Sequence, residues 1–164
     1  MINKTKIVIA DDMEPILLYL ENVISSEPDF QIVGRAKNGK ELIKLVQKYS
    51  PEIVVTDEEM PECNGIEAIE ELNKEGIKAK YILITGNYDC VITSKANNAG
   101  IVKVIKKPIL DNDKFIAQIK EVVSFEAQNT QQKVKENVHY LKTNQSRNNK
   151  YLIKKIAEKI FGSK

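Results

Sequence analysis

The chain has 164 residues, of which 42% are hydrophobic and 29% charged, a length that suits one domain of common size with some residues left over. Its apolar runs, such as residues 7–10 and 81–84, are far shorter than the roughly 20 residues of a membrane span, and no signal peptide is recognisable, which excludes a membrane protein and a secreted precursor. The formal charge of +2 divides unevenly: residues 1–124 carry 16 Lys/Arg and 20 Asp/Glu, whereas residues 125–164 carry 9 Lys/Arg and 3 Asp/Glu, so we expect an acidic domain followed by a basic tail.

Five short runs rich in β-branched residues predict five strands in the acidic domain. They lie at residues 6–10, 30–35, 52–56, 81–85 and 102–105. Each run is apolar along most of its length, which is typical of strands that are covered on both faces.

Amphipathic stretches separate these runs and predict the helices. Apolar side chains recur at helical spacing within residues 16–24, 42–46, 66–72 and 115–123. Asn38 and Asn64 precede the second and third helices, and each is a suitable N-terminal cap. Residues 89–98 are poor in large apolar side chains, so the fourth helix has the weakest pattern.

The alternation of strands and helices predicts an α/β fold, a (βα)5 doubly wound parallel sheet. In such sheets, ligands bind outside the carboxyl ends of the strands. Here Asp11 and Asp12 follow the first strand, Asp57 the third and Lys107 the fifth, while Thr85 ends the fourth. We therefore expect three carboxylates, one hydroxyl and one ammonium group to converge on one edge of the sheet.

Three carboxylates at one edge repel one another and raise one another's pKa unless a cation lies among them. Mg2+ suits such a site, since it prefers oxygen ligands and is held by one or two carboxylates together with phosphate oxygens. A lysine and a threonine opposite the ion would flank a gap of phosphate size, with one carboxylate as the nucleophile that forms an aspartyl phosphate. The pattern thus predicts Mg2+-dependent phosphoryl transfer.

Cysteine and histidine are scarce in this sequence. Cys63 and Cys90 form no CxxC arrangement, which disfavours a disulfide-stapled fold and a structural zinc site and favours a reducing cytoplasm. His139 is the single histidine and has no metal-ligand partner nearby, so we expect it to be an ordinary helix residue.

Four short motifs stand at the ends of predicted strands. They are IVIADD over residues 7–12, VVTDEEMPECNG over 54–65 with the spacing D-x-x-M-P-x-x-x-G, ILITG over 82–86, and KKP over 106–108. Each alone is a weak signal, but four in this order are together specific. On these motifs, residues 1–124 resemble the receiver domain of two-component response regulators, which implies a flavodoxin-like sheet with strand order 2-1-3-4-5.

The resemblance implies a role for each acidic residue. Asp57 would accept the phosphoryl group, as well as contribute to the metal site. Asp12 would bind Mg2+ directly and Asp11 largely through water, while Glu59 would bind it through its backbone carbonyl.

The resemblance also implies roles on the opposite side of the site. Lys107 would hold a phosphoryl oxygen, Thr85 would hydrogen-bond the attached phosphate, and the peptide bond before Pro108 would be cis. Family members commonly carry Tyr or Phe three residues before this lysine, where the present chain has Val104. We therefore expect an altered readout on the face formed by the fourth helix, fifth strand and fifth helix.

Two other phosphate-handling classes fit less well. Haloacid-dehalogenase-like phosphatases also use an aspartyl nucleophile, but they place Thr or Val where Pro61 stands here. A nucleotide-binding domain needs a glycine-rich first turn, and residues 11–15 (DDMEP) contain no glycine. A receiver-like scaffold that is silent to phosphorylation stays open as a third alternative.

Residues 125–164 lie beyond the resemblance. Apolar positions from Ile119 to Leu141 are spaced 4, 4, 3, 4, 4, 3, which predicts a helix that continues the fifth helix beyond the domain. Residues 143–150 (TNQSRNNK) predict a loop or disorder, and a second short amphipathic segment follows. We expect this basic helical tail to serve dimerisation or docking, with DNA binding through a truncated output segment as the alternative.

The sequence therefore predicts a cytoplasmic response regulator with a receiver domain over residues 1–124 and a tail over residues 125–164. Its expected partner is a histidine kinase or phosphotransfer protein that phosphorylates Asp57. Its expected catalysis is limited to its own phosphorylation and dephosphorylation.

Overall fold

The computed structural model describes residues 4–124, so the predicted tail over residues 125–164 lies outside the described residues. Strands and helices alternate along the described chain, as predicted. The elements are β1 (Thr5–Ala10), α1 (Glu14–Ser25), β2 (Phe30–Ala36), α2 (Gly39–Tyr49), β3 (Ile53–Asp57), α3 (Gly65–Lys74), β4 (Lys80–Thr85), α4 (Cys90–Asn98), β5 (Lys103–Lys106) and a fifth helix that includes residues 112–124.

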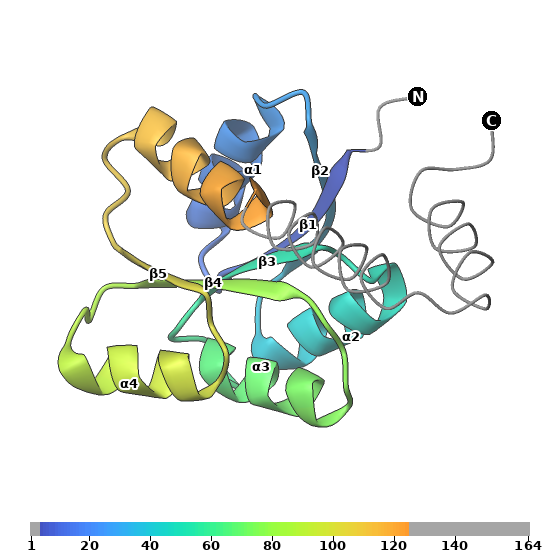
Figure 1. Cartoon of the computed structure of the whole chain (residues 1–164), viewed down its shortest axis with the longest axis vertical. Coiled ribbons are helices and arrows are strands. Elements are labelled where there is room, and N and C mark those ends of the chain that lie inside the picture. Colours follow the sequence, from blue (N-terminus) through green and yellow to red (C-terminus); the bar gives the residue numbers. More distant parts are fainter. Residues whose placement is uncertain (1–3, 125–164) are drawn as a thin grey trace, which may run out of the picture. The chain divides into compact units, whose positions relative to one another are not determined.

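The strands form one parallel sheet in the order β2-β1-β3-β4-β5, which confirms the predicted topology. Figure 1 shows α1 and the helix over residues 112–124 on one face of the sheet and α2, α3 and α4 on the other. Both faces are therefore covered, and the carboxyl ends of the strands remain at a common edge where short loops lead into the helices.

The central strands β1 and β3 carry the most deeply buried side chains. Val8 and Val54 belong to the hydrophobic core beneath α2, α3 and α4. Ile7 and Ile9, the β1 residues on either side of Val8, are also fully buried. They lie on the face of the sheet opposite to Val8, because successive strand side chains point to opposite faces. This two-sided burial explains why residues 7–10 of β1 and 53–55 of β3 are all apolar.

The edge strand β2 departs from the expectation of full coverage. Its residues 32–35 are only partly buried, because β2 has a neighbouring strand on one side only. Observed strand bounds also differ from the predicted ones by about one residue, since β3 ends at Asp57 and β5 at Lys106. Pairing of Asp57 with Ile84 and of Lys106 with Thr85 extends β3 and β5 by one polar residue each beyond the predicted runs.

Side-chain caps begin four of the helices in the described chain, and at the fifth helix the cap is Asp111, whose Oδ1 accepts a hydrogen bond from the Lys114 N–H at 2.9 Å. The Asn38 side chain accepts a hydrogen bond from the Glu41 backbone N–H at 2.8 Å, and Asn64 forms a reciprocal capping box with Glu67, which confirms both predicted caps. Asp89 caps α4, which has only two buried residues. The cap therefore supports the helix whose apolar pattern is weakest.

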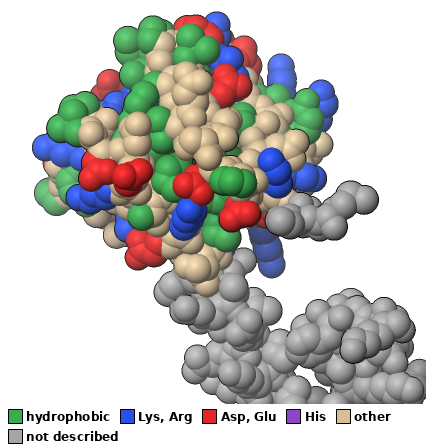
Figure 2. All heavy atoms as spheres, turned by 90° about the horizontal axis from the view of Figure 1, so that it is seen from above, with side chains coloured by type: hydrophobic (Ala, Val, Ile, Leu, Met, Phe, Trp, Pro, Cys, Tyr) green, Lys and Arg blue, Asp and Glu red, His purple; other side chains and the backbone are tan. Residues whose placement is uncertain are grey.

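Charged side chains on the surface are mixed rather than gathered by sign. Figure 2 shows acidic and basic side chains interspersed over the face viewed from above. Arg35 illustrates this mixing, since it pairs with both Glu14 and Glu21 of α1. None of the helices in the described part of the chain is long and apolar enough to cross a membrane.

Candidate functional site

Backbone hydrogen bonds continue past the ends of two strands and tie β1 to its neighbour β2 and β3 to its neighbour β4. The Asp11 N–H donates to the Ala36 carbonyl at 3.1 Å, and the Glu58 N–H donates to the Ile84 carbonyl at 3.0 Å. These bonds hold the first residue after each strand in line with the sheet. The side chains that follow β1 and β3 are consequently presented from rigid backbone.

Three carboxylates meet at this edge, as predicted. Asp11, Asp12 and Asp57 each offer a carboxylate oxygen, and these oxygens lie within 4.8 Å of one another. Asp11 and Asp57 are buried, whereas Asp12 is exposed. Such a set of hard oxygen donors, open to solvent on one side, fits a divalent cation that keeps some of its water.

Lys107 faces the two buried carboxylates. Its Nζ lies 2.8 Å from Asp11 Oδ2 and 2.9 Å from Asp57 Oδ1. Burial by itself lowers the pKa of Lys107, but hydrogen bonds to Asp11 and Asp57 outweigh it and raise the pKa above its usual value. Lys107 is therefore positively charged. Its single charge is too small to balance the three carboxylates at this edge.

Asp57 is a buried carboxylate at the end of β3, the central strand of the sheet. Its side chain is 8% exposed, and this burial raises its pKa above the usual value. Hydrogen bonding to Lys107 opposes the shift, and the nearby Asp11 charge adds to it. The carboxylate thus lies in a place where an added cation stabilises its ionised form.

The predicted site residue Thr85 ends β4, but its hydroxyl does not contact Asp57. Thr85 Oγ1 donates a hydrogen bond to the Glu58 carboxylate and accepts one from the Asn87 backbone N–H at 2.9 Å. The prediction did not include Glu58. The signal that could have identified it is strand register, since Asp57 pairs with Ile84 and the following residues on the two strands are Glu58 and Thr85.

The remaining predicted site residue is Glu59, two positions after Asp57. Glu59 is exposed, and its predicted ligand is its backbone carbonyl rather than its side chain. Lys106 is exposed as well, on the strand position next to Lys107. The peptide bond between Lys107 and Pro108 is cis, as expected.

A close backbone contact positions the loop after Asp57. The Gly65 N–H donates to the Glu58 carbonyl at 2.9 Å, and a Cβ atom on Gly65 would lie 2.0 Å from the Asp57 carbonyl oxygen. Only glycine lets the first turn of α3 approach the acidic site this closely. Burial and the neighbouring Glu67 raise the pKa of the Cys63 thiol in the same loop, which disfavours its nucleophilic thiolate form.

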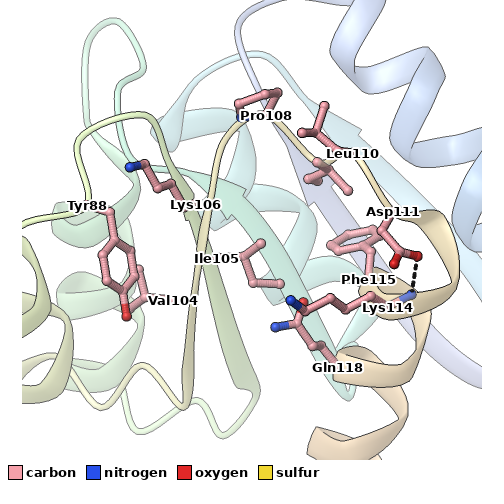
Figure 3. A pocket seen from close by; sticks show the side chains of 11 residues that line it. Tyr88, Val104, Ile105, Lys106, Pro108, Leu110, Asp111, Lys114, Phe115 and Gln118 are labelled. Carbon is pink, nitrogen blue, oxygen red and sulfur yellow. Dashed lines mark hydrogen bonds between the residues drawn. The ribbon is translucent and has the colours of Figure 1, made fainter.

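A separate hollow of about 350 Å³ lies beside β5, between the loop before α4 and the fifth helix (Figure 3). Val104, where an aromatic residue is common among receiver domains, lines this hollow together with Tyr88, which is 51% exposed. An aromatic side chain is therefore present on this face, supplied by the loop before α4 instead of by β5.

Comparison with known proteins identifies the fold and the family. The model of the response regulator receiver domain matches residues 7–120. A protein-glutamate methylesterase/protein-glutamine glutaminase of Pyrococcus horikoshii is 32% identical over 128 residues, which cover 72% of this chain and 34% of that protein. The transcriptional regulatory protein DegU of Brevibacillus brevis is 28% identical over 120 residues, covering 73% and 50%. The chain thus spans about a third to a half of the length of these curated relatives.

Solved structures agree with this match. The response regulator domain of Thermotoga maritima CheB superposes with a TM-score of 0.67 at 26% identity, covering 74% of this chain and 96% of that one. The CheX–CheY–BeF3–Mg complex of Borrelia burgdorferi gives a TM-score of 0.69 at 24% identity, covering 74% and 90%. Since the family model spans most of the described chain and the sheet order agrees with it, the chain belongs to the family of response regulator receiver domains.

Proposed function

We propose that the protein is a signalling switch whose Asp57 accepts a phosphoryl group from a phosphohistidine of a partner histidine kinase or phosphotransfer protein. A carboxylate oxygen of Asp57 forms the new bond to phosphorus, while the bond from phosphorus to the imidazole nitrogen breaks and leaves its electron pair on that nitrogen. The observation that carries this proposal is the enclosed Asp57 carboxylate, held 2.9 Å from Lys107 and beside two further acids.

The donor set supports a Mg2+ ion held by Asp11, Asp12 and Asp57, with the Glu59 backbone carbonyl as a further ligand. Three carboxylates against the single charge of Lys107 leave an excess that a divalent cation neutralises. When bound, the ion supplies compensation for the negative charge on the phosphoryl oxygens. Asp11 and Asp57 are kept in place for this task by their contacts with Lys107.

Lys107 and Thr85 are the chain's own partners for the attached phosphoryl group. Lys107 already contacts Asp57 and would transfer its hydrogen bond to a phosphoryl oxygen. Thr85 is 1% exposed at the end of the neighbouring strand and would donate its hydroxyl proton to another phosphoryl oxygen. The segment after Thr85 is then the part of the chain that responds to the added charge of about −2.

The proposal limits the chemistry of this chain to its own phosphorylation and dephosphorylation. The Pyrococcus horikoshii relative named as a methylesterase is matched over only 34% of its length, and the family model covers residues 7–120. We also place the protein in the cytoplasm, a proposal supported by its two cysteines, which are both free thiols.

The direct test is phosphate uptake from a small phosphodonor in the presence of Mg2+, followed by intact-mass spectrometry. We expect the wild-type chain to gain one phosphoryl group and Asp57→Asn to gain none, because the amide is not a nucleophile. Asp29→Asn is a matched control, since Asp29 is an exposed acid at the opposite end of the sheet. Uptake should also stop when EDTA removes the metal.

Two results would contradict the proposal. Uptake that survives Asp57→Asn would place the phosphoacceptor elsewhere. A wild-type chain that takes up no phosphate would support the alternative of a scaffold that is silent to phosphorylation.

A further inference from the structure

Glu58 is the one carboxylate beside the site with a hydrogen bond to Thr85 in the described part of the chain. The Thr85 hydroxyl donates to Glu58 Oε2, while its oxygen accepts a hydrogen bond from the Asn87 N–H at 2.9 Å. A threonine hydroxyl has a single proton to donate. In this structure that proton is directed to Glu58 and not toward Asp57.

The backbone on both sides of this contact is held by strand pairing. The Glu58 N–H donates to the Ile84 carbonyl and the Glu58 carbonyl accepts from Gly65. The Thr85 carbonyl accepts from the Lys107 N–H at 2.8 Å. The two side chains are thus set opposite each other by the register of β3 and β4, and breaking their contact requires a side-chain or loop movement.

A phosphoryl group on Asp57 would compete for the same proton. The Glu58 carboxylate and a phosphoryl oxygen are both anionic acceptors, and hydrogen bonds to either are stronger than those between neutral groups. Thr85 cannot serve both acceptors with one proton. Any contact between Thr85 and a phosphoryl group must therefore be made at the expense of the contact with Glu58.

We propose that Glu58 is a positioning residue that competes with the phosphoryl group for the Thr85 hydroxyl and so favours the unphosphorylated conformation of the loop before α4. This inference rests on the proposed phosphorylation of Asp57. The hydrogen bond between Thr85 and Glu58 must break before Thr85 can bind the phosphoryl group, and this cost reduces the net binding free energy of that group. In a chain without the Glu58 carboxylate, the Thr85 hydroxyl has no such competing acceptor. The loop before α4 then adopts the phosphorylated conformation more readily.

The test uses beryllofluoride with Mg2+, a mimic of the phosphoryl group, titrated into the full-length chain and followed by NMR. We expect Glu58→Ala to lower the beryllofluoride concentration at half-saturation by about three- to tenfold, the range for losing one competing charged hydrogen bond. The Thr85 methyl resonance of Glu58→Ala without beryllofluoride should move toward its position in the saturated wild-type chain. Glu58→Gln, which keeps a neutral acceptor, should give an intermediate effect.

A double-mutant cycle separates this mechanism from simple charge repulsion. In a Thr85→Ala background, Glu58→Ala should change the half-saturation concentration by less than about twofold, whereas Thr85→Ser should restore the full effect. The charge-matched control is Glu70→Ala, which removes an exposed acid from α3 and should leave the titration unchanged.

The outcomes are distinct. If Glu58→Ala tightens binding equally with and without the Thr85 hydroxyl, repulsion explains the effect and the inference is wrong. If wild type and Glu58→Ala bind beryllofluoride alike, the inference is wrong while the proposed function stands. If Asp57→Asn binds beryllofluoride as well as the wild-type chain does, the proposed function fails and the inference fails with it.

Discussion

At the scale of single residues, the site depends on a carboxylate that is enclosed before it reacts. Burial raises the pKa of Asp57, so the folded chain holds the carboxyl proton more tightly than the unfolded chain does. The stabilisation from that proton is present at low pH and is lost as the pH rises through the folded-state pKa. At neutral pH without metal, the ionised Asp57 therefore destabilises the fold.

The raised pKa of Asp57 predicts how this residue affects thermal stability in metal-free buffer. Asp57→Asn should unfold at a higher temperature than the wild-type chain at pH 7, and the difference should shrink as the pH falls through the folded-state pKa of Asp57. Calorimetry or thermal circular dichroism across this pH range measures it. Mg2+ should reverse the order at pH 7, because the wild-type site gains more from the cation. Equal melting temperatures at every pH would contradict the assigned effect of burial.

At the scale of elements, α3 and the loop before it place Asp57 at the right depth. The approach of the first turn of α3 to the Asp57 carbonyl leaves no room for a methyl group at Gly65. Substituting alanine for glycine near a helix start is usually favourable, but here the added Cβ meets backbone rather than a flexible side chain. Loop and helix must therefore separate to accept it.

We expect Gly65→Ala to lower the free energy of unfolding by about 1–3 kcal/mol, the usual effect of overpacking, and to slow phosphate uptake at Asp57. Urea denaturation and the uptake assay measure the two effects. Gly86→Ala is the control for stability, because a Cβ atom at Gly86 meets nothing within 4 Å. A Gly65→Ala chain with wild-type stability would show that the loop accommodates the methyl group.

At the scale of the whole molecule, charge divides along the sequence, because residues 1–124 carry an excess of acidic side chains and residues 125–164 an excess of basic ones. The apolar repeat that begins at Ile119 continues in the sequence to Leu141, and an apolar stripe of this kind needs a partner surface. We propose self-association through residues 125–164, with DNA binding as the alternative. Their charge of +6 alone would give only salt-sensitive, sequence-independent affinity for DNA.

Deletion of residues 126–164 should convert a dimer into a monomer in sedimentation experiments, while Asp57 still accepts phosphate. On this proposal the apolar repeat would supply the buried surface of the dimer, so its loss would remove the association and leave the receiver fold unchanged. A full-length chain that is monomeric at high concentration, with or without phosphate, would rule out self-association. Salt-dependent binding of a DNA duplex by the intact chain would support the alternative.

The sequence by itself determined the order of the elements and the edge at which the chemistry lies. Apolar runs and helical periodicity are local properties, and Asn38 and Asn64 cap their helices through contacts three residues away. Parallel strands bring their carboxyl ends to one edge, so the sequence alone predicts that Asp11, Asp57 and Lys107 lie together.

Only the tertiary structure decided the partners within that edge. Lys107 lies 96 residues from Asp11 in the chain, and the hydrogen bond between Thr85 and Glu58 depends on the register of β3 against β4 and on side-chain rotamers. Residue type and spacing predict which groups converge. They do not predict which acceptor receives the single hydroxyl proton of Thr85, because packing among residues distant in the sequence selects that acceptor.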